Sequence, residues 1–387
     1  MFRRLGYLFC FLFIFLQANA FSTKAQYAFL IDATTGSVLY KKNAYKKMAP
    51  SSMSKLMTLY ITFERLQNGS MKLPDKILVS TKAWRMGGTR MFLPPNTFVS
   101  VEDLLRGVIV QSGNDASVVL AEGIAGSEKD FAALMNAKAL ELGLKQTHFS
   151  NATGLPNKDH YMSAADIATL SAKIIKNFPK QYHYFSETEF TFNNIKQSNR
   201  NTLLNINGVD GLKTGNTDAG KYGVVVSASQ DGRRLIAVIN GARNVKERAI
   251  EAQRLLQYGF LNYSNIAISK KLNALDQIPV FLGEIDKVNF GTKEPIIFTI
   301  PLTKKGKTQV KVKYPSIVYA PIDMSKKIGD ITIKLYDGQT YNLDLYPAKE
   351  VKKVGFLKEI FVKIKTWFQT FSFSPPKSNE KTRDFMI

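Results

Sequence analysis

The chain has 387 residues, of which 45% are hydrophobic and 22% are charged, a balance that is typical of a globular protein. This composition excludes a fibrous or wholly disordered chain, and the length predicts two or three domains with a sizeable core. Lysine and arginine outnumber aspartate and glutamate by 53 to 31, which gives a formal charge of +22. Such a charge attracts polyanions, and composition alone favours nucleic acid and anionic lipid equally.

The first twenty residues have the organisation of a secretory signal peptide. Arg3 and Arg4 precede an almost wholly apolar run over residues 5–16, and Ala18 and Ala20 are small residues where a signal peptidase cleaves. Residues 1–20 are therefore predicted to be removed on export. The alternative is an uncleaved anchor, but the apolar run is shorter than the roughly 20 residues of a spanning helix. Export argues against nucleic acid as a partner and favours anionic lipid or wall polymer.

The only cysteine, Cys10, lies inside this segment. The mature chain is therefore expected to have no disulfide, no thiolate nucleophile and no metal bound by cysteine. Cys10 has no small residues around it that would suggest a lipidation site, so we interpret it as part of the apolar run.

Residues 27–260 have strand patterns at both ends and helical patterns between them. The strands are expected at 28–32, 36–40, 223–228 and 234–239. The helices are expected at 55–66, 101–110, 115–126 and 128–142. The last two strands are joined by Asp231-Gly232, a turn pair that is typical of hairpins. We therefore predict an α+β domain over residues 21–263, in which helices cover an antiparallel sheet.

The next segment, 264–347, has almost no helical periodicity. Apolar residues alternate with polar ones over 309–314 and again over 331–335, and Asp337-Gly338 then turns the chain. This alternation predicts a small all-β sandwich domain. The segment contains no cluster of side chains that suggests catalysis.

A third pattern occupies residues 348–373. Bulky apolar residues recur every three or four positions, at Val354, Leu357, Phe361, Ile364, Phe368 and Phe371. Lysines fill much of the remaining surface, so we predict an amphipathic helix that lies flat in a membrane interface. The alternative is a helix that packs on the second domain. Residues 374–387, which begin with Ser374-Pro375-Pro376, are predicted to be a disordered tail.

Three short motifs suggest chemistry, and the first is Ser52-Met53-Ser54-Lys55. Pro50 before it and the apolar residues after it place Ser52 at the start of a helix. Residues three apart share one helix face, so Lys55 can take the proton of the Ser52 hydroxyl if its pKa is lowered. The helix start also offers backbone N–H groups to a developing oxyanion. Alone, the motif could be a capped helix with a solvated lysine.

The second motif, Ser112-Gly113-Asn114, follows an apolar run and precedes an expected helix. A hydroxyl and an amide on a tight glycine turn can relay a proton and hold a substrate carbonyl. The alternative for this motif alone is a turn followed by a helix N-cap.

The third motif is Lys213-Thr214-Gly215, which follows Asp210-Gly211. A lysine, a hydroxyl and a glycine on a strand edge form a cationic pocket without an obstructing side chain, which suits a peptide that ends in a carboxylate. The alternative is a solvated lysine at a strand edge.

Together the motifs are far more specific than any one of them. Ser-x-x-Lys, Ser-x-Asn about 60 residues on and Lys-Thr-Gly about 100 residues further resemble the penicillin-recognising serine enzymes. From about Ala28 to Phe371 the chain resembles the low-molecular-weight, type-5 class of D-alanyl-D-alanine carboxypeptidases, peptidase family S11. The resemblance includes the segments 151–155, 163–166, 189–193, 199–201 and 209–215. It implies a transpeptidase or β-lactamase-like catalytic domain.

The resemblance also implies catalytic roles. Ser52 would be the acylated nucleophile and Lys55 its general base. Ser112 would assist proton transfer to the leaving D-alanine, with Lys213 electrostatically coupled to it, and Asn114 would bind the substrate backbone.

Four further residues would bind the substrate. Thr214 would contact the terminal carboxylate beside the open position at Gly215, and Arg248 would help to hold that carboxylate. The backbone N–H groups of Ser52 and Asn216 would form the oxyanion hole. Asn216 departs from the family, because many relatives have histidine or an aromatic residue there.

The expected activity is removal of the terminal D-alanine from peptidoglycan pentapeptide stems, with β-lactams acylating the same serine. No metal or organic cofactor is implied. The expected location is the periplasmic face of the inner membrane, where the C-terminal helix would bind anionic lipid.

Several alternatives remain open. A class A β-lactamase would need a deacylating glutamate, and the Glu189 to Asn193 spacing lacks the expected leucine and lies far past Ser112. A metallo-carboxypeptidase would need histidines at ligand spacing, which His148, His160 and His183 do not have. A D,D-endopeptidase of the same family and an inactive, membrane-bound wall-binding protein are the other two.

Overall fold

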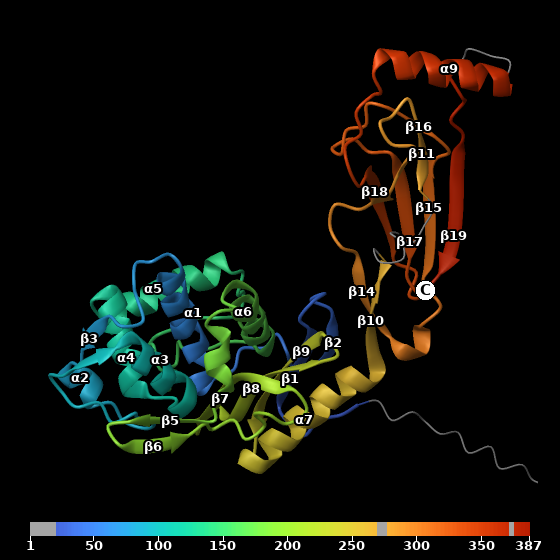
Figure 1. Ribbon diagram of the computed structural model, residues 1–387. Coiled ribbons are helices and arrows are strands. Elements are labelled where there is room, and N and C mark those ends of the chain that lie inside the picture. The colour runs from blue at the N-terminus through green and yellow to red at the C-terminus, as the bar shows by residue number, and fades with distance from the viewer. Residues whose placement is uncertain (1–20, 269–276, 371–374) are drawn as a thin grey trace, which may run out of the picture.

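The computed structural model describes residues 21–268, 277–370 and 375–387. The predicted signal peptide lies outside these residues. A helix-rich body and a narrower β body follow one another along the chain, and a helix lies across the far end of the second (Figure 1). The last helix of the first body ends at Asn262, and the strand that follows begins at Tyr263.

A five-stranded antiparallel sheet forms the centre of the helix-rich body, in the order β2-β1-β9-β8-β7. The strands are β1 (Tyr27–Asp32), β2 (Val38–Lys42), β7 (Val209–Thr217), β8 (Lys221–Gln230) and β9 (Arg233–Ala242). Both faces of this sheet are buried. Successive side chains of a strand point to opposite faces, so each strand contributes residues to two core clusters. In β1, Phe29 and Ile31 join one core cluster, whereas Ala28 and Leu30 join the other. The predicted antiparallel sheet covered by helices is confirmed.

Seven α-helices of the described chain pack around this sheet. They are α1 (Lys55–Gln67), α2 (Thr81–Trp84), α3 (Val101–Arg106), α4 (Asn114–Ala125), α5 (Glu128–Glu141), α6 (Ala164–Asn177) and α7 (Val245–Asn262). Several begin at a polar cap: the Ser163 side chain, for example, accepts a hydrogen bond from the backbone N–H of Asp166. Two two-stranded antiparallel sheets, β3 (Lys76–Leu78) with β4 (Phe98–Ser100) and β5 (Glu189–Phe192) with β6 (Ile195–Ser198), complete the body.

The helix predicted over 101–110 differs in its second half. The chain continues from α3 as a wider π-helical turn at Gly107–Gln111, and Ser112 then takes a left-handed conformation with φ 64°. Wider turns of this kind are often found at functional sites. Here the turn ends the helix at Ser112, which belongs to the second sequence motif.

The second body is built from short strands, as predicted. They are β10 (Tyr263–Ala267), β11 (Ile278–Phe281), β12 (Lys287–Val288), β13 (Phe290–Gly291), β14 (Ile297–Pro301), β15 (Gln309–Pro315), β16 (Val318–Tyr319), β17 (Gly329–Lys334) and β18 (Thr340–Pro347). The alternating residues Val310, Val312, Ile331 and Ile333 all face its core. The alternation in the sequence therefore identified the buried face correctly.

The prediction of a disordered tail over residues 374–387 is wrong. Residues Glu380–Met386 form β19, which pairs antiparallel with β15 from Gln309 to Pro315. Phe385 and Ile387 pack against the β core. An unpaired β15 would expose a row of backbone N–H and C=O groups, and β19 satisfies them. The many charged residues of the tail concealed this strand, since backbone pairing does not depend on apolar side chains.

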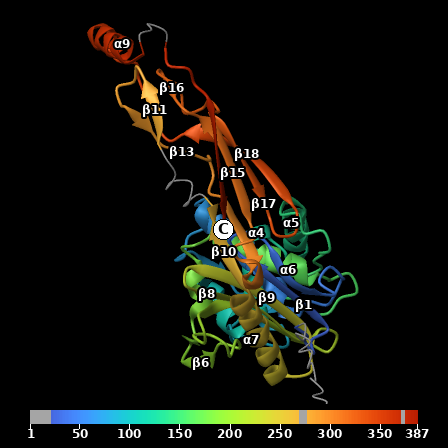
Figure 2. The same ribbon diagram turned by 90° about the vertical axis from the view of Figure 1, so that its right-hand side faces the viewer.

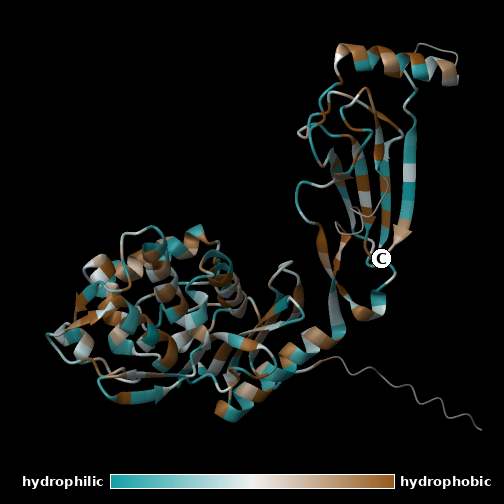
Figure 3. Cartoon of the chain, in the orientation of Figure 1, coloured by the Kyte–Doolittle hydropathy of each residue, from teal (hydrophilic) through white to brown (hydrophobic). Residues whose placement is uncertain are grey.

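The predicted amphipathic helix begins later than expected. It is α9 (Phe356–Thr370), whereas Val351 and Val354 are buried against the β body. Leu357 and Phe361 of α9 are 84% and 69% exposed. Phe371, assigned to the same apolar stripe, lies outside the described residues. Figure 2 shows α9 at the opposite end of the molecule from the helix-rich body, and Figure 3 shows apolar and polar residues alternating along it.

Candidate active site

Ser52 lies in a 3₁₀ turn (Ser51–Ser54) that runs directly into α1. Lys55 is fully buried, and its Nζ lies 3.0 Å from Ser52 Oγ. The same Nζ donates to Asn114 Oδ1 at 2.7 Å and to the Thr153 carbonyl at 2.6 Å. A neutral amine has two N–H groups and one lone pair. Because the amide oxygen and the carbonyl can only accept, they use both N–H groups and leave the lone pair for the Ser52 hydroxyl.

Burial also adjusts the basicity of this amine. The pKa of Lys55 is lowered from 10.5 to about 7, chiefly by desolvation and to a smaller extent by the nearby Arg200, while Asp115 opposes the shift. Near neutral pH a large fraction of Lys55 is therefore unprotonated and able to accept the serine proton. The solvated lysine that the motif alone allowed is excluded.

Ser112 presents a free hydroxyl to the same site. Its Oγ is buried and has no hydrogen-bond partner among the residues that the structure describes. Its carbonyl accepts from Thr89 Oγ1, and the following Asn114, at the start of α4, donates from Nδ2 to the Gly87 carbonyl at 2.7 Å. Both side chains are thus held by the backbone around them, and the Ser112 hydroxyl is left available to a reacting group.

Lys213 is the second buried lysine of the site. It projects from β7, and its Nζ lies 3.4 Å from the Thr214 carbonyl. Burial, and then the positive charges of Lys55, Arg200 and Arg248, hold the pKa of Lys213 well below its usual value. The solvated strand-edge lysine is therefore also excluded.

Gly215 has a packing role that the sequence did not reveal. A Cβ at this position would lie 2.9 Å from the Pro50 carbonyl and 3.1 Å from Ser51 Cβ. Glycine therefore allows β7 to pass against the turn that carries Ser52. Because β7 is an edge strand, one side of its backbone remains open to an extended peptide.

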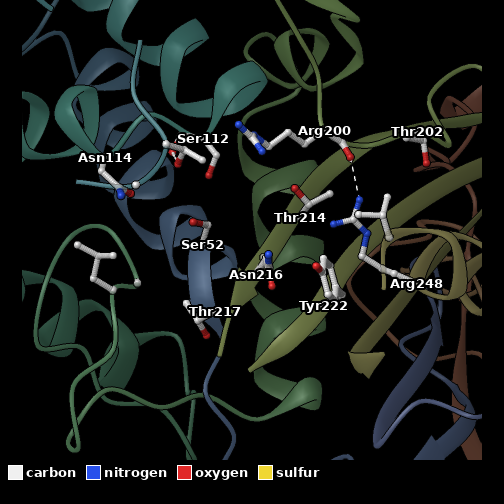
Figure 4. Close-up of a pocket in the computed structure, with 16 residues that line it drawn as sticks. Ser52, Ser112, Asn114, Arg200, Thr202, Thr214, Asn216, Thr217, Tyr222 and Arg248 are labelled. Carbon is white, nitrogen blue, oxygen red and sulfur yellow. Dashed lines mark hydrogen bonds between the residues drawn. The ribbon is translucent and has the colours of Figure 1, made fainter. Parts of the chain in front are cut away.

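Two arginines form the cationic side of the pocket. Arg248, on α7, is buried and donates to the Arg200 carbonyl at 2.9 Å, the contact drawn as a dashed line in Figure 4. Burial lowers the pKa of Arg248 to about 10, so it remains protonated at neutral pH. Arg200 also lines the pocket, and its Nε donates to the Gln111 carbonyl at 3.3 Å. Planar guanidinium groups are well suited to bind a carboxylate.

These residues surround one cavity of about 400 Å³ (Figure 4). Seven of the nine predicted site residues line it: Ser52, Ser112, Asn114, Thr214, Gly215, Asn216 and Arg248. The other two, Lys55 and Lys213, lie buried behind its wall. All three sequence motifs therefore meet at a single cleft.

Comparisons with known proteins agree with this geometry. The family model described as D-alanyl-D-alanine carboxypeptidase (peptidase S11) matches residues 15–244, and that of the penicillin-binding protein 5 C-terminal domain matches 263–353. The D-alanyl-D-alanine carboxypeptidase DacF of Bacillus subtilis is 38% identical over 358 residues, 88% of this chain and 89% of the relative. This chain belongs to the S11 D-alanyl-D-alanine carboxypeptidase family.

Solved structures of S11 carboxypeptidases and other penicillin-binding proteins show the same architecture. Penicillin-binding protein 5 from Haemophilus influenzae is 35% identical with a TM-score of 0.73, covering 86% of this chain and 99% of that one. Penicillin-binding protein D2 from Listeria monocytogenes, in an ampicillin-bound form, is 30% identical with a TM-score of 0.58. It covers 62% of this chain and 99% of its own length. The predicted catalytic fold and β domain are confirmed.

The alternatives from outside the S11 family find no support in the site. Glu189 lies on β5, forms an ion pair with Lys196 and does not line the catalytic pocket, so it is not placed to activate a deacylating water. Among the residues that the structure describes, no group of three histidine, cysteine, aspartate or glutamate side chains could hold a metal ion.

Sequence reasoning missed three contributors to this S11 site. Arg200 lies in a segment that supported the family resemblance, but it was given no role. The Thr153 and Gly87 carbonyls, which fix Lys55 and Asn114, belong to loops whose contacts depend on the fold. For Arg200, the only signal in the sequence was its position between two asparagines in the segment 199–201.

Proposed function

We propose that this chain is a serine-type D-Ala-D-Ala carboxypeptidase that removes the terminal D-alanine from peptidoglycan stem peptides through an acyl-enzyme on Ser52. The observation that carries the proposal is the contact of the Ser52 hydroxyl with a buried lysine amine whose two N–H groups are already used. Its curated relatives are named for this reaction.

In the first half-reaction, the terminal carboxylate of the substrate lies between Thr214 and the two guanidinium groups of Arg200 and Arg248. Lys55 takes the Ser52 proton as Oγ attacks the carbonyl carbon of the penultimate D-alanine. The backbone N–H groups of Ser52 and Asn216 stabilise the oxyanion. As the C–N bond breaks, the hydroxyl of Ser112 gives its proton to the leaving amine and receives the proton that Lys55 had taken from Ser52, so that Lys55 is neutral again.

In the second half-reaction, water attacks the ester and gives up its proton to the basic groups of the site. The peptide is released one residue shorter, and Ser52 regains its hydrogen. Lys213, whose pKa is lowered by burial and by the neighbouring cations, adds a further polar group on β7 behind the pocket. A β-lactam presents a strained amide and a carboxylate in the same relative positions, so it is expected to acylate Ser52.

The decisive experiment is product analysis. The purified protein is incubated with a peptide that ends in D-Ala-D-Ala, and the expected products are free D-alanine and a peptide shortened by one residue. A cross-linked dimeric stem peptide is tested in parallel, because cleavage of that substrate alone would indicate an endopeptidase. Release from neither substrate would refute the proposal.

We also propose that the exported protein is held at the outer face of the inner membrane by α9. Among the described residues, no helix combines the length and apolar character needed to cross a bilayer. The α9 helix exposes Phe356, Leu357, Phe361 and Phe368. Lys353, which lies just before the helix, and Lys363 within it both form ion pairs with Glu359. Exposed aromatic residues beside lysines favour an interface with anionic lipid.

The anchor can be tested by changing two apolar residues of α9. The L357Q/F361Q variant is expected to lose about a hundredfold in affinity for anionic vesicles, because two large side chains no longer enter the apolar layer. Deletion from Val354 would be a poorer test, since it also removes β19. The matched control is L140Q/L261Q, which alters two residues that are 83% and 73% exposed on the catalytic domain. Co-sedimentation of L357Q/F361Q at the unaltered level would show that α9 is not the anchor.

A further inference from the structure

His160 is a buried histidine that the reaction scheme does not use. Its Nδ1 accepts a hydrogen bond from the backbone N–H of Ser150 at 3.2 Å, and its Nε2 lies 2.8 Å from Ser54 Oγ. Because Nδ1 is an acceptor, the ring proton must be on Nε2. Burial lowers the pKa of His160 to about 4, with smaller contributions from His148 and Lys55, so the ring is neutral at physiological pH.

Ser54 connects this ring to the turn that carries the nucleophile. Its hydroxyl donates to the Ser51 carbonyl at 2.9 Å, which uses its only hydrogen. His160 Nε2 must therefore be the donor to Ser54 Oγ, in agreement with the tautomer. Ser52 lies between the two linked serines, so the imidazole supports the turn from behind.

The loop at 151–155 lies against the same turn. Its Thr153 carbonyl accepts from Lys55 Nζ, and Gly154, at φ +80°, approaches so closely that a Cβ would lie 1.9 Å from the Ser51 carbonyl oxygen. His160 bonds Ser150 at the beginning of this loop and Ser54 in the turn. It is thus one link between the nucleophile turn and the loop that holds the base, beside the hydrogen bond from Thr58 Oγ1 to the Ala152 carbonyl at 2.8 Å.

A second cavity, of about 370 Å³, lies on the other side of this loop. His160 lines it, and Gly154, Leu155 and Thr217 line both this cavity and the catalytic pocket. The loop residues Gly154 and Leu155 therefore lie between the catalytic pocket and a second open space. If the loop moved away from the turn, water could reach the amine from behind.

We propose that His160 is a positioning residue for acylation: through Ser54 it holds the 151–155 loop against the nucleophile turn. The loop then shields the Lys55 amine from water and keeps it directed at Ser52. This inference rests on the proposed function, because it assigns to Lys55 the role of base. It gives a buried histidine a function that none of the three sequence motifs contains.

Loss of this link should appear in the pH dependence of acylation. The charged groups that act on Lys55 are Asp115, Arg200 and Lys213, and none of them is changed by a substitution at His160. Greater hydration of Lys55 would raise its pKa from about 7 toward its ordinary value of 10.5. At a given pH below the midpoint, less of the amine would then be neutral and acylation would be slower.

The test measures the second-order rate of penicillin acylation as a function of pH. In the H160L variant, the midpoint of the profile is expected to rise by about one unit, and the rate below the midpoint to fall about tenfold. The alkaline plateau should change little, because the base is present once it is deprotonated. The H160Q variant retains an N–H donor near the position of Nε2 and should restore most of the original profile.

Two further variants keep the test decisive. S54A removes the oxygen that accepts from His160, together with its donation to the Ser51 carbonyl, so it should reproduce the shift even if H160L fails to fold. H148Q is the control, because His148 contacts the Asp159 carbonyl and not Ser54, and its profile should match the unaltered protein. A folded H160L or S54A protein with an unshifted midpoint would overturn the proposal. Failure of the underlying function would differ, since the unaltered protein would then form no penicillin adduct.

Discussion

Replacing Ser52 with alanine is expected to abolish covalent labelling by penicillin and to lower D-alanine release by at least about 10⁴-fold. Ser52 Oγ is the only atom of this residue that reaches Lys55 Nζ, and alanine removes it while leaving the turn intact. The Ser54 hydroxyl does not replace it, because Ser54 Oγ already donates to the Ser51 carbonyl. The measurement is fluorescent penicillin labelling followed by denaturing electrophoresis.

The control for this variant is S127A, which removes a cap of α5 far from the pocket. It should be labelled as the unaltered protein is. Thermal unfolding of the S52A protein should show an intact fold, so that loss of labelling reports chemistry. Stoichiometric labelling of S52A would place the nucleophile elsewhere and remove the basis of the mechanism.

Replacing Lys55 with methionine should lower the rate of acylation by about 10³-fold, within the range for removal of a general base. Methionine is similar in length and tolerates the buried site, so the effect should be on the rate and not on folding. In the unaltered protein, acylation should rise tenfold per pH unit up to a midpoint near 7 and then level off, because Lys55 acts only when unprotonated.

Stopped-flow acylation between pH 5 and pH 9 tests both statements. The K55M profile should lose the step near neutrality, because the group that titrates there has been removed. K173M, which alters an exposed lysine on α6, serves as the control and should retain the step. A K55M protein that kept the step would assign it to another group.

The sequence identified the catalytic side chains better than the backbone groups that hold them in place. Spacing alone placed Ser52 and Lys55 on one helix face, because helical geometry makes residues three apart neighbours. The order of three motifs then predicted a common cleft, and the structure brings them together. The carbonyls of Thr153 and Gly87 could not be predicted, since every residue has a carbonyl and only the fold determines which one points at Lys55 or Asn114.

The same limit explains the errors in the fold. The sheet and the β domain were predicted because apolar alternation records which face is buried. The strand β19 has few apolar residues, and it is stabilised largely by backbone pairing with β15, which side-chain patterns do not record. Gly215 was interpreted as an open position, whereas the structure shows that it makes room for the turn at Pro50.

The pairing of β19 also changes what kind of element α9 is. The helix connects two segments that both pack in the β domain. Val351 and Val354 lie before it, and β19 follows it. A bilayer that took up α9 along its length would lie across the end of the β domain, and Figures 1 and 2 place the catalytic domain at the other end. The pocket would then be held away from the lipid, with the β domain between them as a spacer.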